Sequence, residues 1–231
     1  DLVPAFHAGI FRGTSPAAAL NIGGIANLTL IPPEGSEAPV LGFDTGPGNM
    51  LLDAWMEKCT GFAYDAEGAF SAGGSVIPEL LSRFMSDPYF ARPAPKSTGR
   101  ERFSPAWLQE RLAAAGETKA DPRDVAATLT ELTAKTIAEA LARTEPETRE
   151  LYVCGGGALN PFLMKRLAAA VREAMPGCAV LSSKARGLDP MEVEGAAFAW
   201  LARAFLLRLP GNLPAVTRAK GPRILGALYP A

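Results

Sequence analysis

Residues 20–31 read LNIGGIANLTLI, and this stretch predicts the centre of the fold. Apolar and polar residues alternate on both sides of Gly23-Gly24, with the two-residue period of strands whose side chains point to opposite faces. A glycine pair between two such runs is typical of a β-hairpin turn. We therefore expect two antiparallel strands here.

The residues that follow predict the next two elements. Pro32, Pro33 and Gly35 break the hairpin, and a third short strand is expected over residues 40–43, ending at Asp44. The segment TGPGN at 45–49 then predicts a turn, with a helix starting at about Met50.

The rest of the chain alternates between helical and strand patterns. The predicted elements are short helices near 78–85 and 105–115 within a loop-rich stretch, a helix after Asp121-Pro122, a strand at 151–154, a helix from Asn160 to about 174, a strand at 179–182 and a final helix at 192–209. This order predicts an α/β fold: a mixed sheet with helices on both faces and an α-rich insertion.

Composition excludes several classes of function. With 23 basic and 24 acidic residues and a net charge of -1, the chain has no basic excess for nucleic acid or an anionic membrane. The longest apolar stretch, 195–209, is interrupted by arginines and is too short to cross a bilayer. Three scattered cysteines favour a reducing compartment, and a single histidine disfavours a histidine-rich metal site.

Three glycine-rich turns follow predicted strands, at 23–24, 46–48 and 155–157. Glycine lets the backbone approach a phosphate closely, and amides at turns and helix starts bind anions. None of the three matches a P-loop or a full dinucleotide fingerprint. Tight turns need glycine in any case, so the pattern favours a phosphate site without identifying one.

Asp44 is the first candidate for chemistry, because it ends a predicted strand beside a glycine turn, where open α/β sheets place ligands. It could act as a general base, or it could cap the turn or helix. The polar loop Lys96-Ser97-Thr98-Gly99-Arg100 could clamp a phosphate or carboxylate, or could be a solvated surface loop.

Other polar side chains have plainer explanations. Glu194 on the last helix is paired, exposed or functional. His7 follows an apolar run and fits a structural role better than a catalytic one. Asp53 and Glu57, four residues apart, are expected on a solvated helix face.

Six segments, taken together, resemble one family. They are LVPAFH (2–7), LNIGGIANL (20–28), GFDTGPGNMLLDAW (42–55), PKSTGRERF (95–103), CGGGALN (154–160) and LPGNLPAVTRA (209–219). All are similar, in the same order, to segments of the anhydro-N-acetylmuramic acid kinases. The resemblance implies the second domain of the actin/hexokinase-like, ribonuclease H-like kinase fold.

The resemblance also implies an activity. ATP, with Mg²⁺, would phosphorylate O6 of 1,6-anhydro-N-acetylmuramic acid while water opens the anhydro bridge at C1. The product would be N-acetylmuramic acid 6-phosphate, in cytoplasmic recycling of peptidoglycan sugar. Opening an anomeric centre with water calls for a carboxylate base, and phosphoryl transfer calls for neutralised charge.

The resemblance assigns roles residue by residue. Asp44 matches the catalytic base, and no metal ligand is assigned. The nucleotide-binding residues implied are Gly23 and Gly24 in the second phosphate loop and Gly155, Gly156, Gly157 and Asn160 in the adenosine motif. The sugar contacts implied are Glu194, Gly46 and Asn49. Lys96, Ser97, Thr98 and Arg100 form an active-site loop whose role is left open.

The resemblance further implies that part of the enzyme is missing. Family members have an N-terminal lobe with the first phosphate loop, so residues 1–231 correspond to a C-terminal lobe, with a core at 15–60 and 121–209, an insertion at about 61–120 and a tail at 210–231. Its expected partners are the absent lobe, a second copy in a homodimer and the amino-sugar substrate, with neither nucleic acid nor membrane. This lobe alone is expected to be inactive.

Two alternatives stay open. The chain could be a nucleotide- or sugar-binding fragment without catalysis, or part of a related sugar kinase with a different substrate.

Overall fold

A computed structural model describes residues 2–229 of the protein; Asp1 and the last two residues of the predicted tail, Pro230 and Ala231, lie outside that range. One five-stranded sheet forms the centre, in the order β3-β2-β1-β4-β5. The strands are β1 (Ala17–Ile22), β2 (Ile25–Ile31), β3 (Leu41–Pro47), β4 (Glu150–Cys154) and β5 (Ala179–Ser182).

The sheet is mixed, as the sequence predicts. β2 pairs antiparallel with both β1 and β3, while β4 runs parallel to β1 and to β5. The hairpin turn lies at Gly23-Gly24, between β1 and β2. Because β1 and β4 are parallel neighbours, their carboxyl ends lie side by side at the same end of the sheet, where α/β folds bind ligands.

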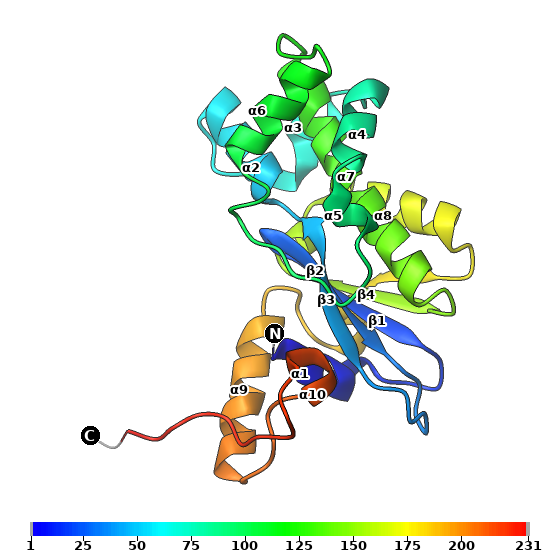
Figure 1. Cartoon of the computed structure of the whole chain (residues 1–231), viewed down its shortest axis with the longest axis vertical. Coiled ribbons are helices and arrows are strands. Elements are labelled where there is room, and N and C mark those ends of the chain that lie inside the picture. The colour runs from blue at the N-terminus through cyan, green and yellow to red at the C-terminus, as the bar shows by residue number, and fades with distance from the viewer. Residues whose placement is uncertain (1, 230–231) are drawn as a thin grey trace.

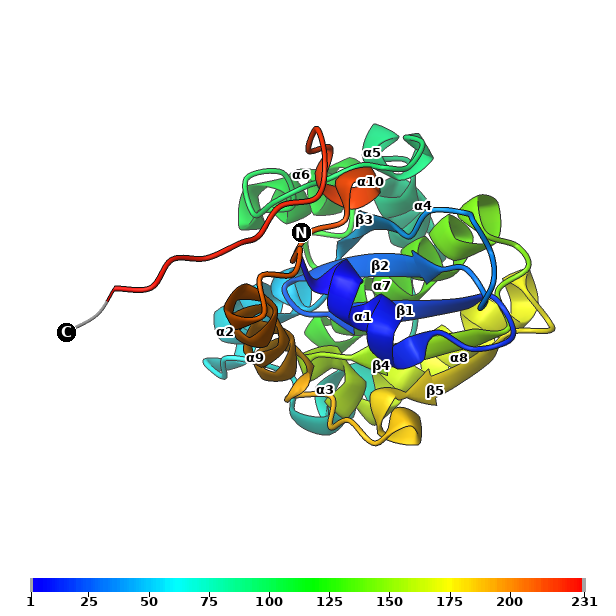
Figure 2. The same ribbon diagram turned by 90° about the horizontal axis from the view of Figure 1, so that it is seen from below.

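Helices cover both faces of the sheet. The helices are α1 (Val3–Phe11), α2 (Met50–Thr60), α3 (Ala69–Ala72), α4 (Pro78–Met85), α5 (Pro88–Ala91), α6 (Pro105–Ala114), α7 (Pro122–Thr144), α8 (Pro161–Ala174), α9 (Val193–Leu206) and α10 (Pro214–Thr217), with short 3₁₀ turns η1 (Ala66–Gly68), η2 (Gly156–Leu159) and η3 (Ser183–Arg186). Figure 2 shows α1 across β1 and β2, with α7 and α8 behind the sheet. The two-faced prediction is confirmed.

Each face buries its own apolar cluster. Leu20, Leu28 and Phe43 pack with α7 and α8, whereas Ala19, Ile31 and Tyr152 pack with Phe11 of α1. Successive residues of a strand enter opposite clusters because side chains alternate between the two faces of a sheet, and β1 and β4 are buried on both faces. The face covered by α1 also meets α9, through Phe6, Cys154 and Val193.

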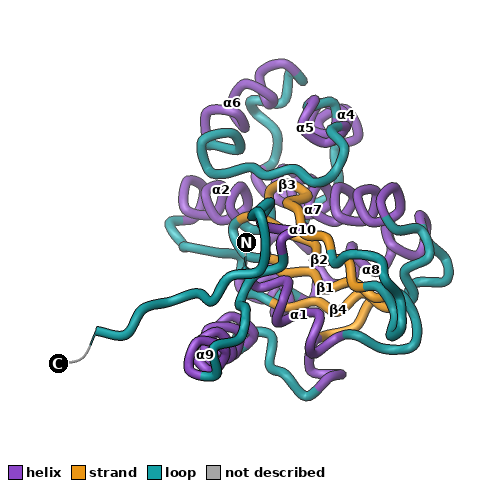
Figure 3. Tube along the Cα trace, turned by 60° about the horizontal axis from the view of Figure 1, so that its bottom comes forward, coloured by secondary structure: helices purple, strands orange, loops and turns teal. Residues whose placement is uncertain are grey.

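Residues 61–120 contain helices and 3₁₀ turns but no strand, and they stand above one end of the sheet (Figures 1 and 3). The insertion has an aromatic core shared with α2 and α7, in which Tyr89, Phe90 and Phe103 are buried with Trp107.

The two predicted helix caps are confirmed. Asp121 caps α7 by accepting from the Arg123 amide, and Asn160 caps α8 by accepting from the Leu163 amide.

The predicted end of the third strand was wrong. β3 does not stop at Phe43 but runs to Pro47, so Asp44 lies mid-strand, opposite Asn27. β3 is an edge strand, where proline leaves no ladder bond unmade. Gly46 takes a φ of 154°, and a Cβ there would come within 2.7 Å of the Phe90 ring, so glycine lets the strand pass the insertion.

The N-terminal helix was missed. The apolar run that precedes His7 forms α1, with Pro4 in its first turn, where proline suits a helix start. The sequence signal for a helix was weak because α1 has apolar residues all round. Its packing between the sheet and α9 stabilises it instead.

Candidate functional site

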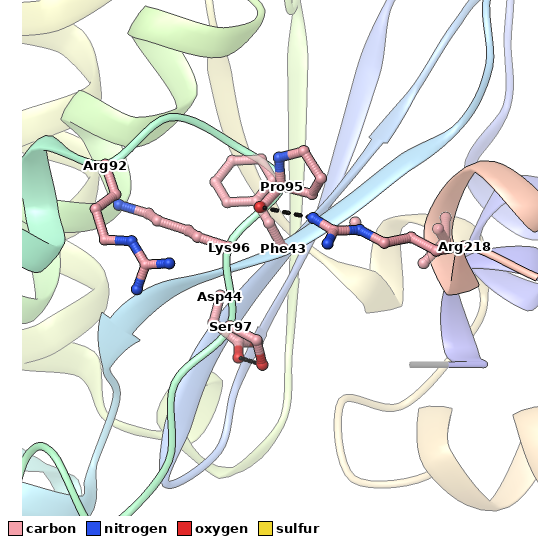
Figure 4. Close-up of a pocket in the computed structure, with 9 residues that line it drawn as sticks. Phe43, Asp44, Arg92, Pro95, Lys96, Ser97 and Arg218 are labelled. Carbon is pink, nitrogen blue, oxygen red and sulfur yellow. Dashed lines mark hydrogen bonds between the residues drawn. The ribbon is translucent and has the colours of Figure 1, made fainter.

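Asp44 is held in one orientation by the loop that follows α5. Its Oδ2 accepts hydrogen bonds from Ser97 Oγ (2.9 Å) and from the Thr98 amide (3.0 Å), as Figure 4 shows for Ser97. Its backbone is tied as well, since the Asp44 amide donates to the Lys96 carbonyl and Tyr89 Oη donates to the Asp44 carbonyl, both at 2.9 Å. Within residues 2–229, Oδ1 accepts no hydrogen bond, so one carboxylate oxygen is left for a ligand.

Lys96 is the anchor of this loop rather than a free cation. Its side chain is only 7% exposed, and Nζ donates to the carbonyls of Tyr89 (3.0 Å) and Phe90 (3.1 Å). Nζ also lies 4.6 Å from the centre of the Tyr89 ring, a cation–π contact. Burial, with the nearby cations Arg143 and Arg92, lowers the pKa of Lys96 to about 8. In this structure the loop binds the protein's own carboxylate, that of Asp44, through Ser97 and the Thr98 amide.

A cavity of about 340 Å³ opens beside Asp44. Lys96 and Ser97 line it with two arginines, Arg92 and Arg218. Arg218 reaches across from the segment after α10 and donates to the Pro95 carbonyl at 3.4 Å (Figure 4). The cavity thus combines one carboxylate with two guanidinium groups, which suits a ligand carrying both hydroxyl and anionic groups.

Two of the three glycine turns interlock. The carbonyls of Gly23 and Gly24 accept from the amides of residues 48–50, at the start of α2. Two of these amides, those of Asn49 and Met50, are among the ones that a helix start leaves without an acceptor in the helix, so the hairpin turn satisfies them. The turn at 46–48 is thereby hydrogen-bonded to the hairpin turn. A Cβ at Gly23 or Gly24 would meet nothing closer than 3.7 Å, so the hairpin turn has space beside it for a ligand.

The third glycine turn, at the end of β4, requires glycine at its first position. Gly155 has a φ of 80°, and a Cβ there would collide with the Asn21 side chain and the Ile22 carbonyl. The turn therefore packs against the end of β1, which brings the ends of the two parallel strands together.

A cavity of about 390 Å³ lies on one side of this turn. Its polar lining includes Asn49, Asn160 and Gly156, and its apolar lining includes Leu52 and Leu159. An apolar slot with a few polar groups at its edge is typical of a site for a flat organic ring.

Asp53 lines the same cavity, and there the prediction of a solvated face was wrong. The side chain is half-buried, and burial raises the pKa of Asp53 to about 6. Glu57 is exposed, as predicted. Residues from the segment 63–67 line the cavity together with Asp53, whereas Glu57 is not part of its lining.

A third cavity, of about 180 Å³, lies between the sheet, α1 and α9. Gly23, Gly155, Gly156 and Glu194 line it, so it gathers predicted residues from three separate segments. Gly156 belongs to this cavity and to the 390 Å³ cavity, and so forms the wall between them.

The structure thus distributes the predicted residues over three neighbouring cavities. Gly24, Gly46, Gly157, Thr98 and Arg100 line none of the three. Sequence reasoning missed Tyr89, Arg92, Asp53 and Arg218. Of these, Asp53 and Arg218 lay in segments that carried the family resemblance. No cluster of three His, Cys, Asp or Glu side chains that could hold a metal occurs within the described part of the chain.

No helix between residues 2 and 229 is both long and apolar enough to cross a membrane. This finding agrees with the interrupted apolar stretch seen in the sequence.

The fold is shared with a solved structure of distant sequence. An activator of the 2-hydroxyisocaproyl-CoA dehydratase from Clostridium difficile, determined with bound ADPNP, superimposes with a TM-score of 0.52 at 14% identity. The match covers 83% of this chain and 61% of that chain. The likeness supports the actin/hexokinase-like fold and, at this identity, nothing finer.

Sequence relatives are much closer. The protein is 53% identical over 231 residues to an anhydro-N-acetylmuramic acid kinase of Pseudomonas paraeruginosa, and 53% identical to one of Xanthomonas campestris. A third, from Cupriavidus pinatubonensis, is 48% identical over 230 residues. The chain spans about three fifths of the length of these relatives, 59 to 61%. The profile of the family described as anhydro-N-acetylmuramic acid kinase matches residues 1–231, and the chain therefore belongs to that family.

Proposed function

We propose that this chain is one lobe of a kinase that uses ATP to phosphorylate O6 of 1,6-anhydro-N-acetylmuramic acid while water opens the anhydro bridge. The observation that carries the proposal is the clamped carboxylate of Asp44, in a family whose named members are kinases of this sugar. A base that takes a proton from a water molecule attacking one carbon of the sugar needs a fixed orientation, and the loop at 96–98 supplies it.

The proposed reaction exchanges one bond at C1 of the sugar and one at the γ-phosphorus of ATP. Oδ1 of Asp44 takes a proton from water, and the water oxygen forms a bond to C1 as the C1–O6 bond breaks. The released O6 forms a bond to the γ-phosphorus of ATP, and the bond from that phosphorus to the bridging oxygen breaks, so that ADP leaves. The proton on Asp44 then passes to solvent.

The nucleotide fits the cavity at the end of β4. We place the adenosine in the 390 Å³ space beside Asn160 and Leu159, with the phosphates running over Gly156 toward the Gly23-Gly24 turn. The half-buried Asp53 carboxylate is placed to meet ribose hydroxyls. Mg²⁺ would neutralise phosphate charge, and because the described residues contain no group of three His, Cys, Asp or Glu side chains that could hold a metal ion, phosphate and water oxygens would hold most of it.

The test uses an enzyme that contains this chain together with the two fifths that the relatives add. Such an enzyme should convert anhydro-N-acetylmuramic acid to the 6-phosphate with ATP, as followed by mass spectrometry of the product. Asp44→Asn should reduce turnover by at least about 10³-fold, since it removes the base while keeping the shape.

The matched control is Asp121→Asn, because asparagine caps a helix as well as aspartate does. We expect near-normal activity from this control. A folded enzyme that leaves the sugar untouched would refute the activity, and normal turnover by Asp44→Asn would remove Asp44 from the role of base.

A further inference from the structure

Lys96 is a buried cation without an acidic partner. Its side chain is 7% exposed, and none of the ion pairs among residues 2–229 includes it. Burial, and after it the neighbouring cations Arg143 and Arg92, lower the pKa of its ammonium group. Lysine side chains usually keep the ammonium group in water or pair it with a carboxylate. The burial of Lys96 therefore needs an explanation other than an ion pair.

The ammonium group of Lys96 binds the loop to the helix that precedes it. Nζ donates to the carbonyls of Tyr89 and Phe90 in α5, seven and six residues earlier in the chain. It also lies over the Tyr89 ring, and Figure 4 shows the side chain extending toward Arg92. Two of its three donor hydrogens are thus used within the protein, and they close the segment 89–96 on itself.

The backbone of the same residue binds Asp44. The Lys96 carbonyl accepts from the Asp44 amide at 2.9 Å, and the next two residues supply the donors to Oδ2, Ser97 Oγ and the Thr98 amide. Three consecutive residues therefore bind Asp44, and the first of them is the one that is fixed to α5. Because Ser97 and Thr98 follow Lys96 directly, a displacement of Lys96 would move both donors away from the carboxylate.

Stability of the fold does not explain the buried ammonium group. Each carbonyl that Lys96 binds has a second donor, since the Arg92 amide donates to Tyr89 and Arg143 Nη1 donates to Phe90, both at 3.1 Å. Loss of the ammonium group would leave neither carbonyl unpaired. Moreover, replacing a buried charge with an apolar side chain of similar volume is often neutral or stabilising.

We propose that Lys96 is a positioning residue for the reaction: by binding the loop to α5, its side chain holds Ser97 and the Thr98 amide on the Asp44 carboxylate. This inference rests on the proposed function, which makes Asp44 the base. It assigns a role to a loop residue whose role the sequence left open.

The first test is Lys96→Met in the complete enzyme, because methionine fills similar space without a charge or a donor. We expect kcat to fall by about 10- to 100-fold, since the base loses its fixed orientation. The KM for either substrate should stay within about twofold of wild type, and the melting temperature should stay close to it. Lys165→Met, at an exposed position of α8, is the matched control and should behave as wild type.

Two outcomes of this test overturn the proposal. Lys96 also lines the 340 Å³ cavity, so a raised sugar KM with an unchanged kcat would make it a ligand-binding residue instead. A parallel fall of kcat and melting temperature would make its role structural.

A double variant tests whether Lys96 acts through the loop. If it does, the loss of kcat in Lys96→Met with Ser97→Ala should be smaller than the product of the two single losses, because both changes release the same carboxylate. A loss equal to that product would mean that Lys96 acts independently of the loop and would contradict the proposal.

The Thr98 amide reports on the same bond without any turnover. In the ¹⁵N-labelled 231-residue chain, Lys96→Met should shift the Thr98 amide proton in the same direction as Asp44→Ala does, whereas Lys165→Met should leave it in place. A Thr98 signal that Lys96→Met does not move overturns the proposal. A shifted Thr98 signal together with a folded complete enzyme that leaves the sugar untouched would keep the link from Lys96 to Asp44 and reject the proposed function instead.

Discussion

At the residue scale, the site depends on how one carboxylate is oriented. A strand position gives Asp44 its direction, but the strand alone leaves the carboxyl group free to rotate. Ser97 and the Thr98 amide remove that freedom by binding the same oxygen. The sequence left the role of this loop open, and the structure shows that it holds Asp44.

Ser97→Ala should therefore lower kcat of the complete enzyme by about tenfold with little change in either KM, because one of two hydrogen bonds that orient Asp44 is lost. Steady-state kinetics with both substrates would show this. Ser86→Ala serves as the control, since that hydroxyl bonds only the local Arg83 carbonyl. Equal kinetics for the two variants would mean that the Thr98 amide suffices.

At the scale of elements, the insertion positions the loop through a buried aspartate. Asp87 is 4% exposed and accepts from Arg102, Arg111 and the Trp107 indole. These donors join the start of α5 to the loop after it and to α6, so the residues that bind Asp44, Ser97 and Thr98, lie between the joined segments. Burial alone would raise the pKa of Asp87, but the bonds from Arg102, the Tyr89 amide and Trp107 outweigh it and lower the pKa.

Asp87→Ala should lower the free energy of unfolding by about 3–5 kcal/mol, because it leaves two arginines and an indole without their acceptor. Urea denaturation followed by circular dichroism would measure it. The control is Glu79→Gln, which breaks an exposed ion pair with Arg83 and should cost less than about 1 kcal/mol. Similar losses for both would show that the cluster is not what joins these helices.

The same cluster predicts an acid dependence. Because the pKa of Asp87 is lower in the folded than in the unfolded chain, its contribution is complete above the ordinary aspartate pKa, about 4, and is lost as the pH falls below it. The difference in stability between wild type and Asp87→Asn should therefore shrink on acidification below about pH 4. A constant difference would contradict this assignment.

At the scale of the whole molecule, the three cavities lie in a chain that spans about three fifths of the length of its relatives. The sheet is flanked by the insertion on one side and by α1 and α9 on the other (Figure 1). Each cavity is open to solvent on this lobe alone, whereas phosphoryl transfer requires water to be excluded from the reacting groups. We therefore assign catalysis to the complete enzyme.

Calorimetry with ATP tests whether the 231-residue chain needs the rest of the enzyme to bind nucleotide. The 231-residue chain should bind ATP weakly or not at all, since one lobe offers only part of the contact surface, and it should not turn over the sugar. The complete enzyme should bind ATP more tightly. Micromolar affinity of the chain alone would favour the alternative of a self-sufficient nucleotide-binding module.

The sequence by itself determined the hairpin at 20–31, the order of the later strands and helices, both capping residues and the family. These follow from local periodicity, from turn chemistry and from residue types at fixed spacing, all of which are properties of short segments. Only the tertiary structure decided that β3 continues through Asp44, that Lys96 is buried, and that His7 is buried against Thr29 of β2. Each of these depends on contacts between segments distant in the chain: Gly46 against Phe90, Lys96 against the carbonyls of α5, and α1 against the sheet. The free energy of such contacts comes from burial and pairing across the fold, which no local pattern records.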